Sequence, residues 1–75
     1  MVKIYTTPAC VYCKMAKEFF KEHDIAYEEK DVSADKAVLD EMIQKSGQMG
    51  TPVIDVDGKI VVGFDEAAIK DLLKL

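Results

Sequence analysis

Residues 52–63, PVIDVDGKIVVG, restrict the fold of this chain more than any other segment. Two runs rich in β-branched residues flank the dipeptide Asp57-Gly58. Asp and Gly tolerate the positive φ angles of a two-residue turn, so the segment predicts a tight β-hairpin. Any fold for this chain must therefore contain an antiparallel pair of strands in its C-terminal half.

The residues before this hairpin alternate between strand and helix patterns. Residues 2–6 and 25–32 predict strands, and apolar residues at three- and four-residue spacing predict an amphipathic helix over residues 11–22. A second helix is expected after Ser33 or Asp35, either of which can act as its N-cap, and Gly47 is expected to end it. The apolar face of this helix comprises Val38, Leu39, Met42 and Ile43.

A third helix is predicted after the hairpin, with Asp65 as its N-cap. Phe64 and Ile69 have the spacing of a hydrophobic staple at the start of this helix. We expect the helix to bury Ile69, Leu72 and Leu73.

The predicted order is β-α-β-α-β-β-α, which places the chain in the α/β class. A strand, a helix and a second strand imply two parallel strands with a right-handed crossover, and the hairpin extends them into a mixed four-stranded sheet. Helices should cover both faces of this sheet. The arrangement resembles the thioredoxin-like fold in its shortest form, built as a single domain over residues 1–75.

Composition and charge exclude several classes of function. The net charge is −4, and the ten basic residues are all lysines. Nucleic-acid binders normally present a basic surface with arginines, so nucleic acid is not an expected partner. The N-terminus lacks the apolar block of a secretory signal, and no apolar run approaches the ~20 residues of a membrane span. We therefore expect a soluble monomer in the cytoplasm.

The only two cysteines, Cys10 and Cys13, stand three positions apart where the first strand gives way to the first helix. A structural disulfide closing so small a ring would stabilise the fold by only about 2 kcal/mol. Structural zinc usually takes four ligands, and the remaining candidate, His23, would lie ~15 Å along the helix axis from Cys13. No metal site is expected within one chain, and His23 is expected to be an exposed residue closing the helix.

A redox pair fits the spacing better. With Cys10 at the N-cap and Cys13 at the third helical position, their Cα atoms would lie ~5 Å apart, within disulfide range. The free amides and positive dipole end of the helix favour a thiolate at Cys10, and Lys14 adds a positive charge nearby. Lowering a thiol pKa from ~8.5 to ~6 raises the ionised fraction at pH 7 from about 3% to about 90%. Cys13 should be less exposed and suited to resolving a mixed disulfide.

The sequence resembles small glutaredoxin-like proteins over essentially its whole length. The resemblance rests on YTTPACVYCKMAKEFF (residues 5–20), TPV (51–53) and VVGFDE (61–66). It implies that Cys10 is the nucleophile and Cys13 the resolving cysteine. It also implies that Pro52 follows a cis peptide bond, and that Thr51 offers backbone hydrogen bonds to a bound peptide or to glutathione.

The resemblance further implies a glutathione groove formed by residues from three segments, namely Tyr12, Gln48, Val62, Gly63, Phe64 and Asp65. The Asp65 carboxylate, beside free backbone amides, could receive the charged γ-glutamyl end of glutathione. A simple helix cap is an equally good interpretation of the same residue.

The chain also departs from the pattern of many glutathione-using members. It has Thr7 where they carry a basic residue, Gln48 where they carry Arg or Lys, and Val62-Gly63 where they carry two glycines. Each difference weakens the grip on a tripeptide carboxylate. Val11 and the VGF segment resemble redoxins that are reduced by thioredoxin reductase and serve ribonucleotide reductase.

The sequence thus predicts a thiol–disulfide oxidoreductase that reduces protein or glutathione mixed disulfides. No bound cofactor is expected, glutathione is the expected co-substrate, and glutathione or a flavoprotein disulfide reductase is the expected electron donor. One alternative is a redoxin serving ribonucleotide reductase. A second is a binding module in which Cys10 of two chains and two glutathiones hold an iron–sulfur cluster, and a third is a domain that has lost its activity and only docks partners.

The remaining conspicuous residues receive structural interpretations. We expect core positions for Met15, Phe19, Phe20 and Met42. We expect a solvated acidic rim of Asp55, Asp57 and Glu66, because nothing pairs them at catalytic spacing.

Overall fold

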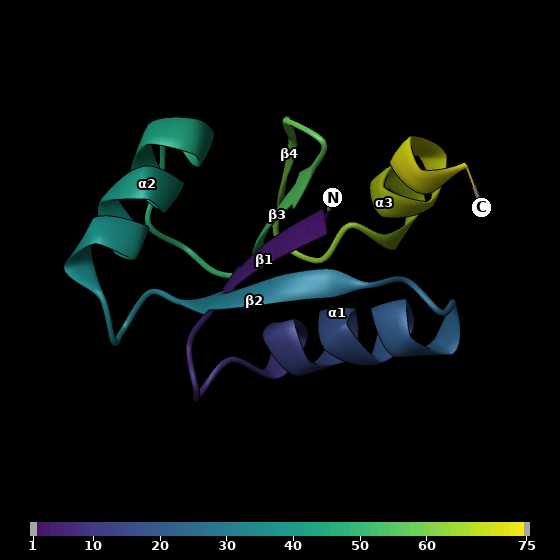
Figure 1. Cartoon of the computed structure of the whole chain (residues 1–75), viewed down its shortest axis with the longest axis horizontal. Helices are drawn as coiled ribbons and strands as arrows, with labels where there is room; N and C mark the ends of the chain where they lie inside the picture. Colours follow the sequence, from purple (N-terminus) through teal and green to yellow (C-terminus); the bar gives the residue numbers. More distant parts are fainter. Residues whose placement is uncertain (1, 75) are drawn as a thin grey trace.

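A computed structural model describes residues 2–74 and contains the elements in the expected order. The described residues form four strands and three helices, and Figure 1 shows how these elements are arranged. Their bounds are β1 (Val2–Thr6), α1 (Val11–Glu22), β2 (Tyr27–Asp31), α2 (Lys36–Ser46), β3 (Val53–Val56), β4 (Lys59–Val62) and α3 (Glu66–Leu73). The three helices, of at most twelve residues, are too short and too polar to span a lipid bilayer.

The strands form one mixed sheet in the order β2-β1-β3-β4. The central strand β1 runs parallel to β2, with Val2 beside Tyr27, and antiparallel to β3, with Val2 beside Val56. The hairpin strands β3 and β4 are antiparallel. The predicted thioredoxin-like α/β fold is therefore confirmed.

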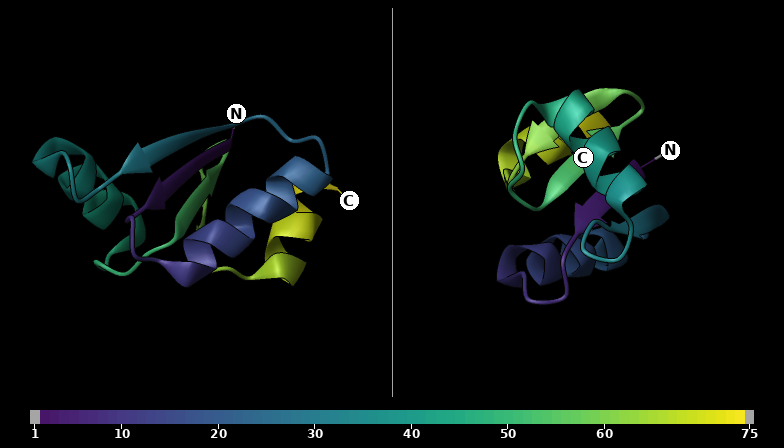
Figure 2. Two further views of the ribbon diagram at one scale, coloured as in Figure 1. Left: turned by 90° about the horizontal axis from the view of Figure 1, so that it is seen from below. Right: turned by 90° about the vertical axis from the view of Figure 1, so that its left-hand side faces the viewer.

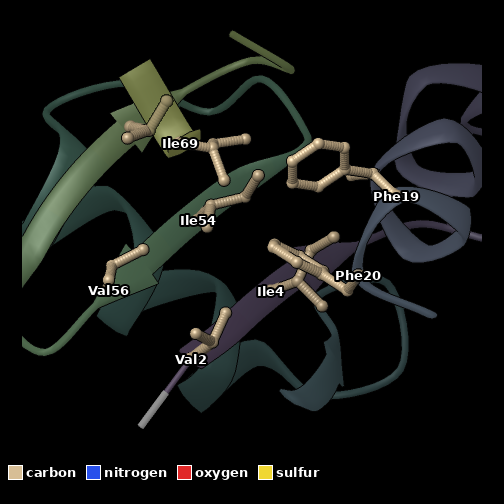
Figure 3. Close-up of a cluster of buried hydrophobic side chains, with 9 residues drawn as sticks. Val2, Ile4, Phe19, Phe20, Ile54, Val56 and Ile69 are labelled. Carbon is tan, nitrogen blue, oxygen red and sulfur yellow. The ribbon is translucent and has the colours of Figure 1, made fainter. Parts of the chain in front are cut away.

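The helices cover both faces of the sheet, as expected. Figure 2 shows α1 and α3 on one side of the strands and α2 on the other. On the first side, Phe19 and Phe20 of α1 pack with Ile4, Ile54 and other core side chains (Figure 3). On the second side, α2 packs on a smaller cluster that contains Tyr5, Val32, Met42 and Val53.

The expected core is confirmed for Phe19, Phe20 and Met42 and is wrong for Met15, which is 44% exposed. Successive residues of an α-helix are rotated by about 100°, so Met15 lies at the edge of the buried face that contains Ala16. In α3, Ile69 is buried as predicted. Leu72 and Leu73 only border the core.

The predicted turn and caps are confirmed. Asp57 and Gly58 have φ angles of 51° and 93°, the left-handed pair that a tight hairpin requires. Asp35, rather than Ser33, caps α2 by accepting a 2.9 Å hydrogen bond from the Ala37 amide. Gly47, at φ 74°, ends α2 in the left-handed conformation.

The second strand is shorter than predicted, because Ile25, which was expected to begin it, takes part in the hydrogen bonds that end α1. His23 is the exposed C-cap of α1, as expected, and Asp24 follows at φ 53°. The Ile25 amide then donates to the Phe20 carbonyl at 2.8 Å and the Asp24 amide donates to the Lys21 carbonyl at 3.2 Å. These two bonds form a Schellman motif, so β2 begins only at Tyr27.

The expected acidic rim is wrong for Asp55, which is only 6% exposed. One of its carboxylate oxygens accepts from Lys45 at 2.8 Å and the other accepts from the Gly58 amide at 2.7 Å. All four residues of β3 are buried, so its polar side chain requires these partners. Asp57 and Glu66 are exposed, as expected.

Candidate active site

The cysteine pair lies at the junction between β1 and α1. Cys10 is the N-cap of α1, and its sulfur accepts the Cys13 amide N–H at 3.1 Å. The Cys10 amide in turn donates to the Thr7 carbonyl at 3.2 Å, which fixes the loop before the helix. The predicted N-cap and third helical positions are both confirmed. One of the free amides at the helix start is therefore directed at the Cys10 sulfur.

Cys10 and Cys13 are joined as a disulfide across this turn, with their Cα atoms 5.2 Å apart. Cys13 is 1% exposed, whereas Cys10 is partly exposed. The expectation that Cys13 is the less exposed of the two cysteines is therefore confirmed. Lys14 is exposed on the first turn of the helix.

A cleft of about 350 Å³ opens beside the pair. It is bounded by the first turn of α1, the segment before β3 and the turn between β4 and α3. Seven of the eight residues predicted to bind substrate line it, namely Tyr12, Thr51, Pro52, Val62, Gly63, Phe64 and Asp65. Neither cysteine is part of this lining, and the cleft is connected to the pair through Tyr12, which stands between the two cysteines in sequence.

Backbone geometry holds two walls of the cleft together. The Thr51–Pro52 peptide bond is cis, as the resemblance implied. The Pro52 carbonyl accepts from the Gly63 amide at 2.8 Å, and Gly63 has φ 78°, a conformation that favours glycine. The segment that carries Thr51 is thus tied to the turn that carries Phe64 and Asp65.

Asp65 acts as a helix cap in this structure, accepting the Ala68 amide at 3.2 Å. Its exposed side chain nevertheless lines the cleft. Phe64 likewise has two roles, because it packs on the core against the Phe19 ring at 5.9 Å and also faces the cleft. Among the lining residues within 2–74, Asp65 carries the only carboxylate, and none is a lysine.

Gln48 is the one predicted binding residue outside the cleft lining. Its side-chain amide donates to the Gly50 carbonyl at 2.9 Å, and its oxygen accepts from the Gly50 amide. Ser46 adds a 3.0 Å hydrogen bond from its hydroxyl to the Gln48 carbonyl. The Gln48 side chain therefore braces the loop that leads to Thr51.

A polar network that the sequence reasoning did not find anchors the same loop. Lys45, near the end of α2, donates to Asp55 of β3 at 2.8 Å and to the Tyr5 hydroxyl of β1 at 3.0 Å, while Tyr5 donates to Glu41. The hydrogen bonds to Asp55 and Tyr5 raise the pKa of Lys45. Burial raises the pKa of Asp55, but the hydrogen bonds from Lys45 and Gly58 outweigh it, so this pKa lies below its usual value. The sequence feature that could have revealed this network is Asp55, an acidic residue within the β-branched run that forms β3.

A second network lies behind the cysteine loop. The buried Thr6 hydroxyl donates to Glu29 of β2 at 2.9 Å, and Lys17 of α1 donates to the same oxygen at 3.0 Å. The hydrogen bonds from Lys17 and then from Thr6 lower the pKa of Glu29. The end of β1 is therefore fastened to β2 and α1 just before Cys10.

Within residues 2–74, no group of three or more His, Cys, Asp or Glu side chains is placed to hold a metal ion.

Comparisons with known proteins agree with this geometry. The glutaredoxin family model matches residues 2–61. A glutaredoxin-like 8.6 kDa protein from the rubredoxin operon of Clostridium pasteurianum is 43% identical over 74 residues, which cover 99% of both chains. Glutaredoxin 3 of Escherichia coli K12 is 32% identical over 65 residues, covering 87% of this chain and 78% of that protein. The glutaredoxin (grx-1) structure from Archaeoglobus fulgidus covers 99% of this chain and 86% of that chain, with a TM-score of 0.89 and 26% identity. The chain therefore belongs to the glutaredoxin family and carries its Cys-x-x-Cys pair at Cys10 and Cys13.

Proposed function

We propose that this protein is a thiol–disulfide oxidoreductase that reduces protein disulfides or glutathione mixed disulfides. The observation that carries the proposal is the 3.1 Å hydrogen bond from the Cys13 amide to the partly exposed Cys10 sulfur at the start of α1. In the reduced protein the same amide and the helix dipole stabilise negative charge on that sulfur. Cys10 is then the nucleophile and Cys13 the resolving cysteine.

The reaction begins when the Cys10 thiolate attacks one sulfur of the substrate disulfide. A bond forms between Cys10 and that sulfur, the substrate S–S bond breaks, and the other substrate sulfur leaves as a thiolate. The cleft beside Cys10 holds the attached part of the substrate. Thr51, next to Pro52, offers its backbone groups to an extended peptide or to glutathione, and Tyr12 and Phe64 supply apolar walls.

The second step needs only the neighbouring turn of the helix. The Cys13 thiolate attacks the Cys10 sulfur, the second substrate thiolate leaves, and the Cys10–Cys13 disulfide forms. A Cα separation of 5.2 Å accommodates this disulfide without a change in backbone position. The substrate has gained two electrons, which a donor must return by reducing the pair. Two molecules of glutathione, or a flavoprotein disulfide reductase, can supply them.

We infer that residues 1–75 act as a single domain, as a monomer, in the cytoplasm. The reducing conditions of that compartment suit a pair that cycles between thiols and a disulfide. The side chains of the reaction are all supplied by one chain, and no further cofactor enters the steps above.

The test of this function is the reactivity of Cys10 across a pH series. In Cys13→Ser, which leaves Cys10 as the only cysteine, alkylation by iodoacetamide should follow an apparent pKa about two units below that of an ordinary thiol. Cys10→Ser should abolish disulfide reduction, and Cys13→Ser should accumulate the mixed disulfide. An apparent pKa near 8.5 together with no turnover of any disulfide would refute the function.

A second experiment assigns the electron donor. The oxidised protein is mixed either with glutathione, glutathione reductase and NADPH, or with thioredoxin reductase and NADPH, and NADPH consumption is followed. Turnover only with thioredoxin reductase assigns a dedicated protein disulfide, such as that of ribonucleotide reductase, as the substrate class. Turnover with glutathione assigns glutathione as co-substrate.

A further inference from the structure

A second groove adjoins the cleft at Phe64 and runs between α1 and the start of α3. It encloses about 200 Å³ and is lined by Met15, Glu18, Phe19, Glu22, Phe64 and Glu66. Its apolar part includes Met15, which is 44% exposed although it is a large hydrophobic residue. We call this hollow the α1–α3 groove. An exposed apolar surface with a polar rim is typical of a contact site for another molecule.

The charge on the rim of the α1–α3 groove is entirely negative. Within residues 2–74, Glu18 and Glu22 form no ion pair, and Glu66 pairs only with Lys70, at 3.1 Å, where both side chains are exposed. Glu18 and Glu22 are also four residues apart on α1, a like-charge spacing that slightly destabilises an isolated helix. In the part of the chain that the structure describes, no lysine lines the groove.

The α1–α3 groove continues the cleft at the cysteines. Phe64 lines both hollows, so a chain that occupies the cleft can extend over this ring into the groove. Along α1, Glu18 lies about 12 Å and Glu22 about 18 Å from Cys10, at 1.5 Å per residue. An extended peptide covers 12 Å in about four residues and 18 Å in about five.

We propose that the α1–α3 groove binds a basic residue of a protein disulfide substrate, four or five residues from the cysteine that Cys10 attacks. The aliphatic stem of a lysine or arginine would lie on Met15 and Phe64, with its cation between Glu18 and Glu22. This inference rests on the proposed function and specifies its substrate class.

Charge complementarity favours a basic side chain over glutathione or a second copy of this chain as the occupant of the α1–α3 groove. Glutathione has two carboxylates and one ammonium group, so its net negative charge disfavours the α1–α3 groove. A second copy of this chain, with net charge −4, is disfavoured for the same reason. A lysine or arginine side chain matches both features, because it combines an apolar stem with a positive head.

The test compares peptides that each contain one cysteine in a mixed disulfide with the same small thiol. One series carries lysine four or five residues before or after the cysteine, and its partner carries alanine there. An exposed ion pair changes affinity by up to about fivefold, so two carboxylates should give lysine a three- to tenfold higher kcat/KM at low salt. The advantage should shrink at 0.5 M salt.

In the variant Glu18→Gln/Glu22→Gln, the ratio of kcat/KM for the lysine peptide to kcat/KM for the alanine peptide should be close to one. The kcat/KM values for the alanine peptide and for bis(2-hydroxyethyl) disulfide should stay unchanged. Glu28→Gln, which removes an exposed carboxylate from β2, is the matched control and should keep the wild-type ratio. Lysine directly beside the cysteine should give no comparable gain.

A ratio of one on both sides of the cysteine in the wild-type protein would overturn the inference, as would an unchanged ratio in the double variant. Both results leave reduction of the alanine peptide intact. Failure of the proposed function is distinguishable from them, because then no peptide in the series is reduced.

Discussion

Replacing Lys45 with methionine should destabilise the protein strongly although a third of the Lys45 side chain is exposed. The variant leaves the Asp55 side chain, itself 8% exposed, with the Gly58 amide as its only hydrogen-bond donor within residues 2–74, and it removes the 3.0 Å hydrogen bond to Tyr5. Removing one partner of a buried ion pair typically costs about 3–5 kcal/mol. Because Lys45 is 32% exposed, solvent screening reduces the expected loss to about 2–3 kcal/mol.

That loss is a large share of the stability of a 75-residue protein, which is about 4–11 kcal/mol. For a domain of this size it should lower Tm by about 10–20 °C. Urea denaturation followed by circular dichroism measures the change in unfolding free energy. Lys30→Met is the matched control, because the only ion-pair partner of Lys30 among the described residues is the Glu41 carboxylate, at 3.6 Å. It should cost less than about 1 kcal/mol.

The pH dependence tests the same interaction. The pKa of Asp55 in the folded protein lies below its ordinary value of 3.8, so its ionisation contributes stability above that value and the contribution is lost as the pH falls through the folded pKa. The difference between wild type and Lys45→Met should therefore shrink below about pH 4. Similar losses for Lys45→Met and Lys30→Met, or a difference that is constant from pH 7 to pH 3, would refute the reasoning.

Three further perturbations have expected outcomes. Met42→Ala, at a fully buried position on the core-facing side of α2, should cost about 2–5 kcal/mol in unfolding free energy, measured by urea denaturation. Gly58→Ala should cost roughly 1 kcal/mol in the same assay, because its φ of 93° disfavours any side chain although space for a Cβ is free. Phe64→Ala should raise the KM for peptide disulfides several-fold while leaving the alkylation rate of Cys10 unchanged, and an unchanged KM would count against Phe64 as a wall of the cleft.

Local rules accounted for most of the fold. The Asp57-Gly58 turn, the Asp35 and Asp65 caps and Gly47 at the end of α2 each depend on one or two residues whose backbone preferences act at short range. The start of the second strand was missed for a related reason. Asp24, rather than a glycine, takes the left-handed position after α1, so the helix termination was not visible in the sequence.

The features that the sequence analysis did not predict depend on contacts between residues far apart in the chain. Asp55 is ten residues from Lys45, and nothing local indicates that the end of α2 reaches over β3 to meet it. Met15 follows the helical periodicity, but the width of the buried face depends on how α3 packs beside α1. The lining of the cleft was anticipated through the family resemblance, because three short motifs meet there from distant parts of the chain.

The central position of β1 has a consequence for attempts to divide this protein. Because β1 hydrogen-bonds to β2 on one side and to β3 on the other, removing it would separate β2 from the β3–β4 hairpin. A fragment beginning at residue 8 would retain both cysteines yet lose the strand that precedes them. Adding a synthetic peptide of residues 1–7 to such a fragment offers a way to restore the sheet, and with it the reactivity of the two thiols.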